Sequence, residues 1–376
     1  MATDGRAANR VTTLELFFDL VFVFTITQLT AVLYHAPTLR SVVQVVLMLG
    51  VIWWMYGGYA WMTNAVSAHT TNRRLLLLGG MGGYFVLALA IPHAFSSSGL
   101  AFGLAYLVVV GVHTTLFTRS SSASVVQGIL RLAPFNLASA LVILVGGAVG
   151  GTPQYALWAA ACAFEWLTPV IRENRGFDIA AAHFVERHGL VVLVAIGESV
   201  VAVGIGASHL AVDGGLVVVA GLGLALSACL WWLYFGGDDE RAELALASMP
   251  PVRRAWAALA GFGYWHLPML FGIVAIAAAE RSALAHPFAA LSWARAALLS
   301  GGVALFLAGD VLFRRELAIG SVTTRTAAAL LAVATLPLSA TVFPAAQIGA
   351  LVALLVACVA IERTATDEIV PSCSTT

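Results

Sequence analysis

Two acidic residues, Glu15 and Asp19, lie in an apolar stretch that predicts a membrane-spanning helix. An ionisable group at bilayer depth costs at least about 2.5–3.5 kcal/mol on insertion scales, so it usually faces a bundle interior or a wet cavity. The spacing of four residues places both carboxylates on one face of the helix. Because two neighbouring negative charges repel, the pair indicates a shared proton, a bound cation or an arginine partner.

A second group of polar residues, His183, Glu186 and Arg187, precedes another apolar run. His183 and Glu186 are three positions apart and share a helix face, a spacing that resembles half of a metal site. The alternative is an ordinary cytoplasmic helix start, where Glu lies near the helix N-terminus and His and Arg meet lipid headgroups. A proton-handling or substrate-contacting role stays open as well. Arg187 is a candidate counter-charge for Glu186 or for a carboxylate of the first span.

Three further candidates lie deeper in apolar runs. Glu198 lies well inside one of them, where its side chain cannot easily reach the interface, and it either hydrogen-bonds neighbouring helices or binds an ion. Ser199 follows it directly. His266 lies close to Pro268, which frees a backbone carbonyl that needs a polar partner, so His266 is a candidate cavity residue. The metal-binding capacity of the chain is otherwise unknown, and no cofactor motif is present.

The composition requires a lipid environment for these residues. Hydrophobic residues make up 60% of the chain and charged residues 10%, far below the roughly 25% charged residues of a soluble domain. We therefore predict an all-α polytopic membrane protein. With about 20 apolar residues per crossing, hydropathy predicts about twelve spans near residues 11–34, 40–63, 75–92, 99–118, 131–150, 154–171, 184–208, 213–235, 255–279, 292–313, 326–342 and 344–362.

The charge distribution predicts the orientation. All basic residues are arginines, and most of them fall into loops on one side of the predicted membrane. The positive-inside rule then places both termini in the cytoplasm, with no cleavable signal expected. The formal net charge of zero does not indicate a nucleic-acid partner. Glu165 and Asp310 are interpreted as salt-bridge residues near cytoplasmic helix ends.

Self-similarity predicts an internal duplication. The WWMYG segment at 53–57 recurs as WWLYFG at 231–236, and aligning the first spans of the two halves sets Asp19 against Glu198. We predict two parallel six-helix repeats, residues 1–175 and 176–363, followed by a disordered tail at 364–376. Parallel repeats are related by an axis along the membrane normal. This symmetry predicts that Asp19 and Glu198 face one central region.

Three segments together resemble one known family: TLELFFDLVFVFTITQL at 13–29, HxxERxGL at 183–190, and GES at 197–199. They resemble the bacterial low temperature requirement protein A (LtrA) family along nearly the whole chain. The resemblance implies a polytopic protein of the bacterial plasma (inner) membrane, and it supplies no catalytic residues. The start of the chain is also loosely similar to six-span-repeat potassium channels, although Phe18 replaces their serine.

The sequence leaves three functional hypotheses open. The leading one is a proton- or cation-coupled transporter or channel that uses Asp19 and Glu198, with Arg187 or Arg10 as counter-charge. A constriction at Ile26 and its repeat partner favours a channel, and a closed cavity with His266 favours a carrier. The second hypothesis is an intramembrane enzyme for a lipid or isoprenoid substrate that uses His183, Glu186 and His188, and convergence of these side chains with Asp19 on one pocket would support it. The third is a scaffold or sensor without flux. The expected partners are the lipid bilayer, a small ion or solute, and a second copy in a homo-oligomer.

Overall fold

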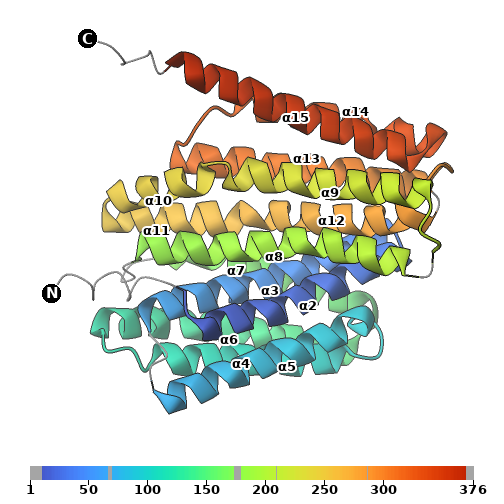
Figure 1. Cartoon of the computed structure of the whole chain (residues 1–376). Helices are drawn as coiled ribbons and strands as arrows, with labels where there is room; N and C mark the ends of the chain where they lie inside the picture. The colour runs from blue at the N-terminus through green and yellow to red at the C-terminus, as the bar shows by residue number, and fades with distance from the viewer. Residues whose placement is uncertain (1–10, 67–69, 173–178, 209, 286, 370–376) are drawn as a thin grey trace, which may run out of the picture. The chain divides into compact units, whose positions relative to one another are not determined.

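The computed structural model describes residues 11–66, 70–172, 179–208, 210–285 and 287–369, and every regular element in these ranges is helical. Figure 1 shows the helices and their labels. Their bounds are α2 Thr13–His35, α3 Leu39–Ala65, α4 Thr71–Ala90 with η1 Ile91–His93, α5 Gly99–Phe117, α6 Ala123–Val149, α7 Gly151–Arg172, α8 Ala181–Ala207, α9 Gly214–Phe235, α10 Asp238–Ser248, α11 Pro251–Ala258, η2 Leu259–Tyr264, α12 His266–Ala285, α13 Trp293–Leu317, α14 Thr323–Ala334, η3 Leu338–Val342 and α15 Pro344–Ile369.

Eleven helices among the described residues are long and apolar enough to cross a membrane. Each predicted span coincides with a helical segment, which confirms the all-α polytopic class. The sixth, α7, is helical but is not one of the eleven. The fifth predicted span started at residue 131, whereas α6 begins at Ala123 and continues through Pro134. At the other end of the chain, α15 runs to Ile369, so the predicted disordered tail starts inside a helix.

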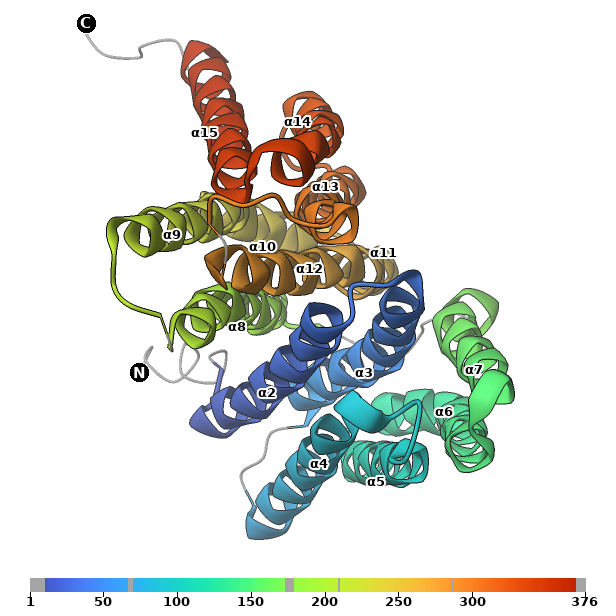
Figure 2. The ribbon, with the colours of Figure 1, turned by 90° about the vertical axis from the view of Figure 1, so that its right-hand side faces the viewer.

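The chain divides into two compact units. The first comprises the described parts of Met1–Val194 and Ala242–Leu267, and the second those of Ala195–Arg241 and Pro268–Thr376. In the first unit α2 packs on α3 and α4, and α4, α5, α6 and α7 follow one another side by side (Figure 2). In the second, α13 packs on α14, and α15 packs on α9 and α14. The six-helix repeats and the orientation of the termini stay predictions.

A π-helical segment of the first unit, η2, lies between α11 and α12 in the chain. The wider turn is visible in the hydrogen bond from Trp265 N to Ala260 O, which spans five residues at 3.1 Å. Pro268 lacks the N–H that a regular helix would offer to the carbonyl four residues earlier. Backbone carbonyls without a helical partner need other donors, and in the π-helical segment Trp53 Nε1 donates to Gly263 O at 2.8 Å.

Candidate functional site

Helix α2 starts with a capping box that fixes the position of Glu15. Thr12 N and Thr12 Oγ1 both donate to Glu15 Oε2 at 2.8 Å, and Glu15 N donates back to Thr12 Oγ1. Such reciprocal bonds satisfy amide groups that the first helical turn leaves without partners. Asp19 follows one turn later on the same face, and both acidic side chains are buried, with 4% and 2% exposed. The predicted shared face is therefore present.

Arg187 of α8 is the counter-charge of both carboxylates. Its Nη2 lies 3.0 Å from Asp19 Oδ1, and its Nη1 lies 3.8 Å from Glu15 Oε1. The guanidinium carbon also lies 5.6 Å from the ring centre of Phe18 and 5.7 Å from that of Tyr56, within the range of cation–π attraction. Of the two partners that the sequence leaves open for Arg187, the structure shows the first-span carboxylates.

His183 joins this cluster in a defined tautomer. Asn64 is oriented by the backbone of Ala180, since it accepts from Ala180 N at 3.0 Å and donates to Ala180 O at 3.1 Å. Its amide nitrogen also lies 3.3 Å from His183 Nδ1. An amide NH2 only donates, so Nδ1 is the acceptor and the ring proton is on Nε2. That nitrogen lies 3.2 Å from Glu15 Oε1 and 3.4 Å from Oε2.

Tyr56 of α3 completes the cluster by donating from its hydroxyl to Asp19 Oδ1 at 2.8 Å. The sequence prediction missed this residue, because Tyr56 was interpreted only as part of the repeated WWMYG segment. A tyrosine within an apolar run is itself a signal, since a buried hydroxyl needs a partner. We call the five side chains Glu15, Asp19, Tyr56, His183 and Arg187 the carboxylate cluster.

The carboxylate cluster is incompletely bonded. Asp19 Oδ2, Glu15 Oε1 and the Nε and Nη1 atoms of Arg187 are buried and have no hydrogen-bond partner among the described residues. Two carboxylates face one guanidinium, and a second proton on His183 would point Nδ1–H at the amide NH2 of Asn64. An uncompensated buried charge is strongly unfavourable. The geometry therefore favours one additional positive charge at the cluster, either a proton or a cation.

The other two residues of the second polar group point elsewhere. Glu186 is exposed and accepts from Val11 N at 3.3 Å. His188 is buried, and its Nδ1 lies 2.9 Å from Phe184 O, one turn back in the same helix. His183, Glu186 and His188 thus do not converge with Asp19, so the convergence that would support the enzyme hypothesis is not present among these side chains. Within the described ranges, no group of three or more His, Cys, Asp and Glu side chains could hold a metal ion.

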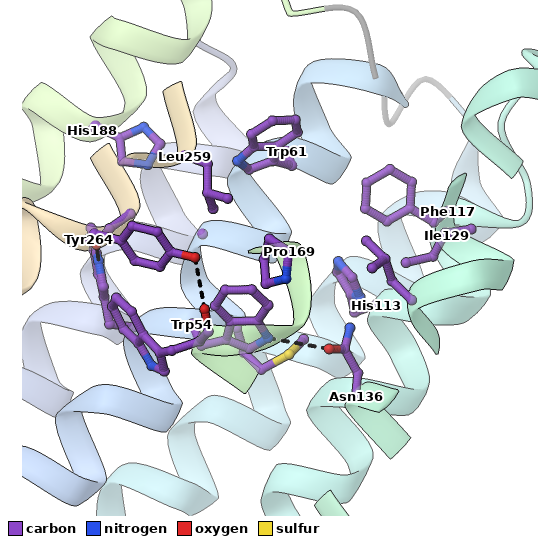
Figure 3. A pocket seen from close by; sticks show the side chains of 17 residues that line it. Trp54, Trp61, His113, Phe117, Ile129, Asn136, Pro169, His188, Leu259 and Tyr264 are labelled. Atoms are coloured by element: carbon purple, nitrogen blue, oxygen red, sulfur yellow. Dashed lines mark hydrogen bonds between the residues drawn. The ribbon is translucent and has the colours of Figure 1, made fainter. Parts of the chain in front are cut away.

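His266 is fully buried and stacks between aromatic rings. Its Nδ1 lies 2.8 Å from Gly261 O, a carbonyl of the π-helical segment, as expected for a polar group beside freed carbonyls. The first unit contains a cavity lined by aromatic residues, and His266 is not among its lining residues. His188 and His113 line that cavity instead (Figure 3).

The second unit holds Glu198 and Ser199, both buried. Ser199 lies beside Glu280 of α12, and an added Cβ on Gly223 would lie 3.3 Å from Glu280 Oε1. Glu280 is 1% exposed. Neither carboxylate oxygen makes a hydrogen bond of regular geometry in the described chain. The sequence prediction missed Glu280 because the predicted span 255–279 ends just before it. The predicted pairing of Asp19 with Glu198 stays a prediction.

A separate charged network in the second unit joins Asp238, Asp310, Arg314, Arg325 and Glu362. Arg314 donates to both oxygens of Asp238, at 2.6 and 3.1 Å, and to both oxygens of Glu362, each at 3.1 Å. Arg325 donates to both oxygens of Glu362, at 3.0 and 3.1 Å, and to Asp238 and Asp310. We call these five residues the arginine network.

Comparison with known proteins assigns the family. The family model described as bacterial low temperature requirement A protein (LtrA) matches residues 10–361. The chain is also 30% identical to the uncharacterized protein RA0937 of Rhizobium meliloti (strain 1021) over 316 residues, which is 80% of this chain and 76% of the relative. The chain therefore belongs to the bacterial low temperature requirement A protein (LtrA) family.

Proposed function

We propose that the protein is a proton- or cation-coupled transporter or channel of the bacterial plasma membrane, and that the carboxylate cluster binds the ion. The observation that carries this proposal is the charge of the cluster. Glu15 and Asp19 share one guanidinium, and the contact of His183 Nδ1 with the Asn64 amide nitrogen favours a hydrogen-bond acceptor at Nδ1. A buried cluster of this kind retains a proton or a cation, and intramembrane ionisable groups mark ion pathways.

Asp19 Oδ2 is the acceptor at which we place the exchanging ion. The other carboxylate oxygen, Oδ1, accepts a hydrogen bond from Tyr56 and pairs with Arg187. Oδ2 has no hydrogen-bond partner among the described residues. Arg187 then holds the carboxylate in position and lowers the cost of its charged state between binding events. In the second unit we assign the equivalent role to Glu198, with Glu280 and Ser199 as polar neighbours.

The test is reconstitution of the full-length protein in liposomes that contain a pH-sensitive dye, under imposed proton, potassium or sodium gradients. We expect flux for the unaltered protein and a loss of about tenfold or more for Asp19→Asn and Glu15→Gln, which corresponds to about 1.4 kcal/mol in a barrier. Glu243→Gln makes the same chemical change at an exposed carboxylate of α10 and is expected to leave flux unchanged.

Absence of flux for the unaltered protein, over a panel of ions and small solutes, would overturn the proposal. The carboxylate cluster would then be a structural lock between α2 and α8, as the scaffold hypothesis holds. Equal flux for Asp19→Asn and Glu243→Gln would retain transport but would remove Asp19 from the ion path.

A further inference from the structure

The first unit contains a cavity between α3, α5, α6, α7 and the π-helical segment (Figure 3). The centre of a water-sized sphere can move through about 80 Å³ of it, several times the roughly 10–15 Å³ that one water needs. Aromatic rings from several helices form its walls, namely Trp53, Trp54, Trp61, Phe117, Trp166 and Tyr264. Flat rings favour stacked or edge-on contact with other rings.

The cavity walls carry no permanently charged side chain, and their titratable groups are the imidazoles of His113 and His188. No aspartate, glutamate or arginine belongs to its lining in the described part of the chain. An ion placed there would lose its hydration without gaining an opposite charge, which is strongly unfavourable. The carboxylate cluster contributes no residue to the lining. The cavity is therefore a separate feature from the proposed ion site, and its walls suit a neutral ligand better than an ion.

Two polar side chains in the lining offer hydrogen-bond donors. His113 is 2% exposed, and its ring nitrogens make no hydrogen bond of regular geometry among the described residues, with the Gly58 backbone as a nearby weak partner. Asn136 accepts from Trp54 Nε1 at 3.3 Å through its Oδ1 atom, which leaves its NH2 group to donate. A neutral imidazole offers one N–H and an amide offers two. An unmade hydrogen bond of a buried group costs about 1–3 kcal/mol, so these donors favour a ligand that carries an acceptor oxygen.

We propose that this cavity binds a neutral, planar ring compound with a carbonyl oxygen. The ring packs against the indoles, and the oxygen accepts hydrogen bonds from His113 and Asn136. This binding site is independent of the proposed ion movement, because its lining shares no residue with the carboxylate cluster.

Gly57 gives a way to fill the cavity. It belongs to the lining, and a Cβ added to it meets no atom within 4 Å. Leucine at this position therefore projects into the cavity without a backbone clash. Gly79 of α4 offers a matched control, because its Cβ position is equally open, the residue is exposed, and it does not line the cavity. Both changes replace a mid-helix glycine and raise helix propensity alike.

The experiment titrates duroquinone, a neutral ring with two carbonyl groups, into the purified full-length protein in detergent while tryptophan fluorescence is recorded. We expect saturable quenching for the unaltered protein and for Gly79→Leu. Gly57→Leu is expected to weaken binding by about tenfold or more, because the leucine side chain would fill space that the ligand needs. His113→Leu is expected to weaken it by about three- to tenfold, the value of one hydrogen bond, and His113→Gln, which keeps a donor, to restore it.

Three results would overturn the proposal. Quenching that never saturates, or that is equal for Gly57→Leu and Gly79→Leu, would show partition into the detergent alone. Equal binding by His113→Leu and the unaltered protein would contradict the carbonyl contact. Tight binding of the anionic 1,4-naphthoquinone-2-sulfonate would contradict the choice of a neutral ligand. Size-exclusion chromatography of each variant confirms that the fold is retained, so that a loss of quenching reports binding.

Discussion

The carboxylate cluster and the arginine network use the same side chains in opposite ways. In the network, Arg314 binds two carboxylates through paired bonds, and among its five residues only Asp310 Oδ1 is buried without a hydrogen-bond partner in the described chain. In the cluster, Arg187 touches Asp19 and Glu15 through single atoms, and its Nε and Nη1 lack hydrogen-bond partners there. Paired guanidinium–carboxylate bonds are the strong, geometrically fixed kind.

The two groups also differ in charge balance. The network has three carboxylates, and exposed Arg241 adds a third guanidinium by pairing with Asp238 at 3.0 Å. The cluster has two carboxylates and one guanidinium. A group with balanced charge and nearly complete bonding has less need of a further ion than an unbalanced one. Under the proposed function, incomplete bonding and uneven charge distinguish the carboxylate cluster from the arginine network, whereas burial of charge is common to both.

The largest expected effect is a difference in stability between variants of two adjacent arginines of α13, Arg314 and Arg315. Arg314→Met leaves Asp238 and Glu362 without their shared partner, and removal of one member of a buried ion pair costs about 3–5 kcal/mol. Arg315 is exposed, so Arg315→Met is expected to stay within about 0.5 kcal/mol. Thermal unfolding in detergent measures both. Equal unfolding temperatures would mean that the arginine network does not stabilise the fold.

A smaller effect compares one aspartate from each group. Asp238→Asn unbalances the arginine network and weakens charged hydrogen bonds, each of which contributes about 1.5–3 kcal/mol. Asp19→Asn removes the excess negative charge of the carboxylate cluster and keeps the acceptor for Tyr56, so we expect a change in unfolding free energy below about 1 kcal/mol. Chemical unfolding in mixed micelles gives the two values. A larger loss of unfolding free energy for Asp19→Asn would show that the carboxylate cluster stabilises the fold as much as the arginine network does.

The smallest expected effect concerns the capping box that positions Glu15. Thr12→Ala removes the side-chain cap of α2 and is expected to cost about 1 kcal/mol. Thr38→Ala removes the comparable cap of α3, where the Thr38 hydroxyl accepts from Ser41 N, and serves as the control. If both variants lose equal stability but only Thr12→Ala loses flux, the cap positions Glu15 for function. Unchanged flux for both would limit Thr12 to a structural role.

The helices were predictable from the sequence because hydropathy is a local property of each segment. The partner of Arg187 was predicted only as one of two alternatives, Glu186 or a carboxylate of the first span. The interpretation of Asp310 as a salt-bridge residue is confirmed by its contact with Arg325. Glu165 received the same interpretation, yet it accepts a hydrogen bond from the Tyr106 hydroxyl at 2.6 Å. The sequence shows that a buried carboxylate needs a partner, but it does not show whether that partner is charged.

The remaining features depend on contacts between distant parts of the chain. The sequence did not single out Arg325 or Glu362 as partners, because the network forms only when α13, α14 and α15 pack together. The tautomer of His183 depends on Asn64, which lies 119 residues earlier in the chain. The cavity depends on Gly57 and Gly58 of α3 lining the same space as aromatic residues of other helices. None of these pairings leaves a periodic pattern in the sequence.

The π-helical segment bears on how relatives could be compared. A π turn holds one residue more than the α turn it replaces, and such turns recur at functional sites. Here the wider turn supplies the carbonyl of Gly263 that binds Trp53, and it forms one wall of the cavity. A homologue with one residue fewer between Leu259 and Tyr264 would lose both, even with every aromatic residue preserved. The length of this segment in an alignment would therefore indicate which family members retain the cavity, and it would do so better than the identity of the aromatic residues.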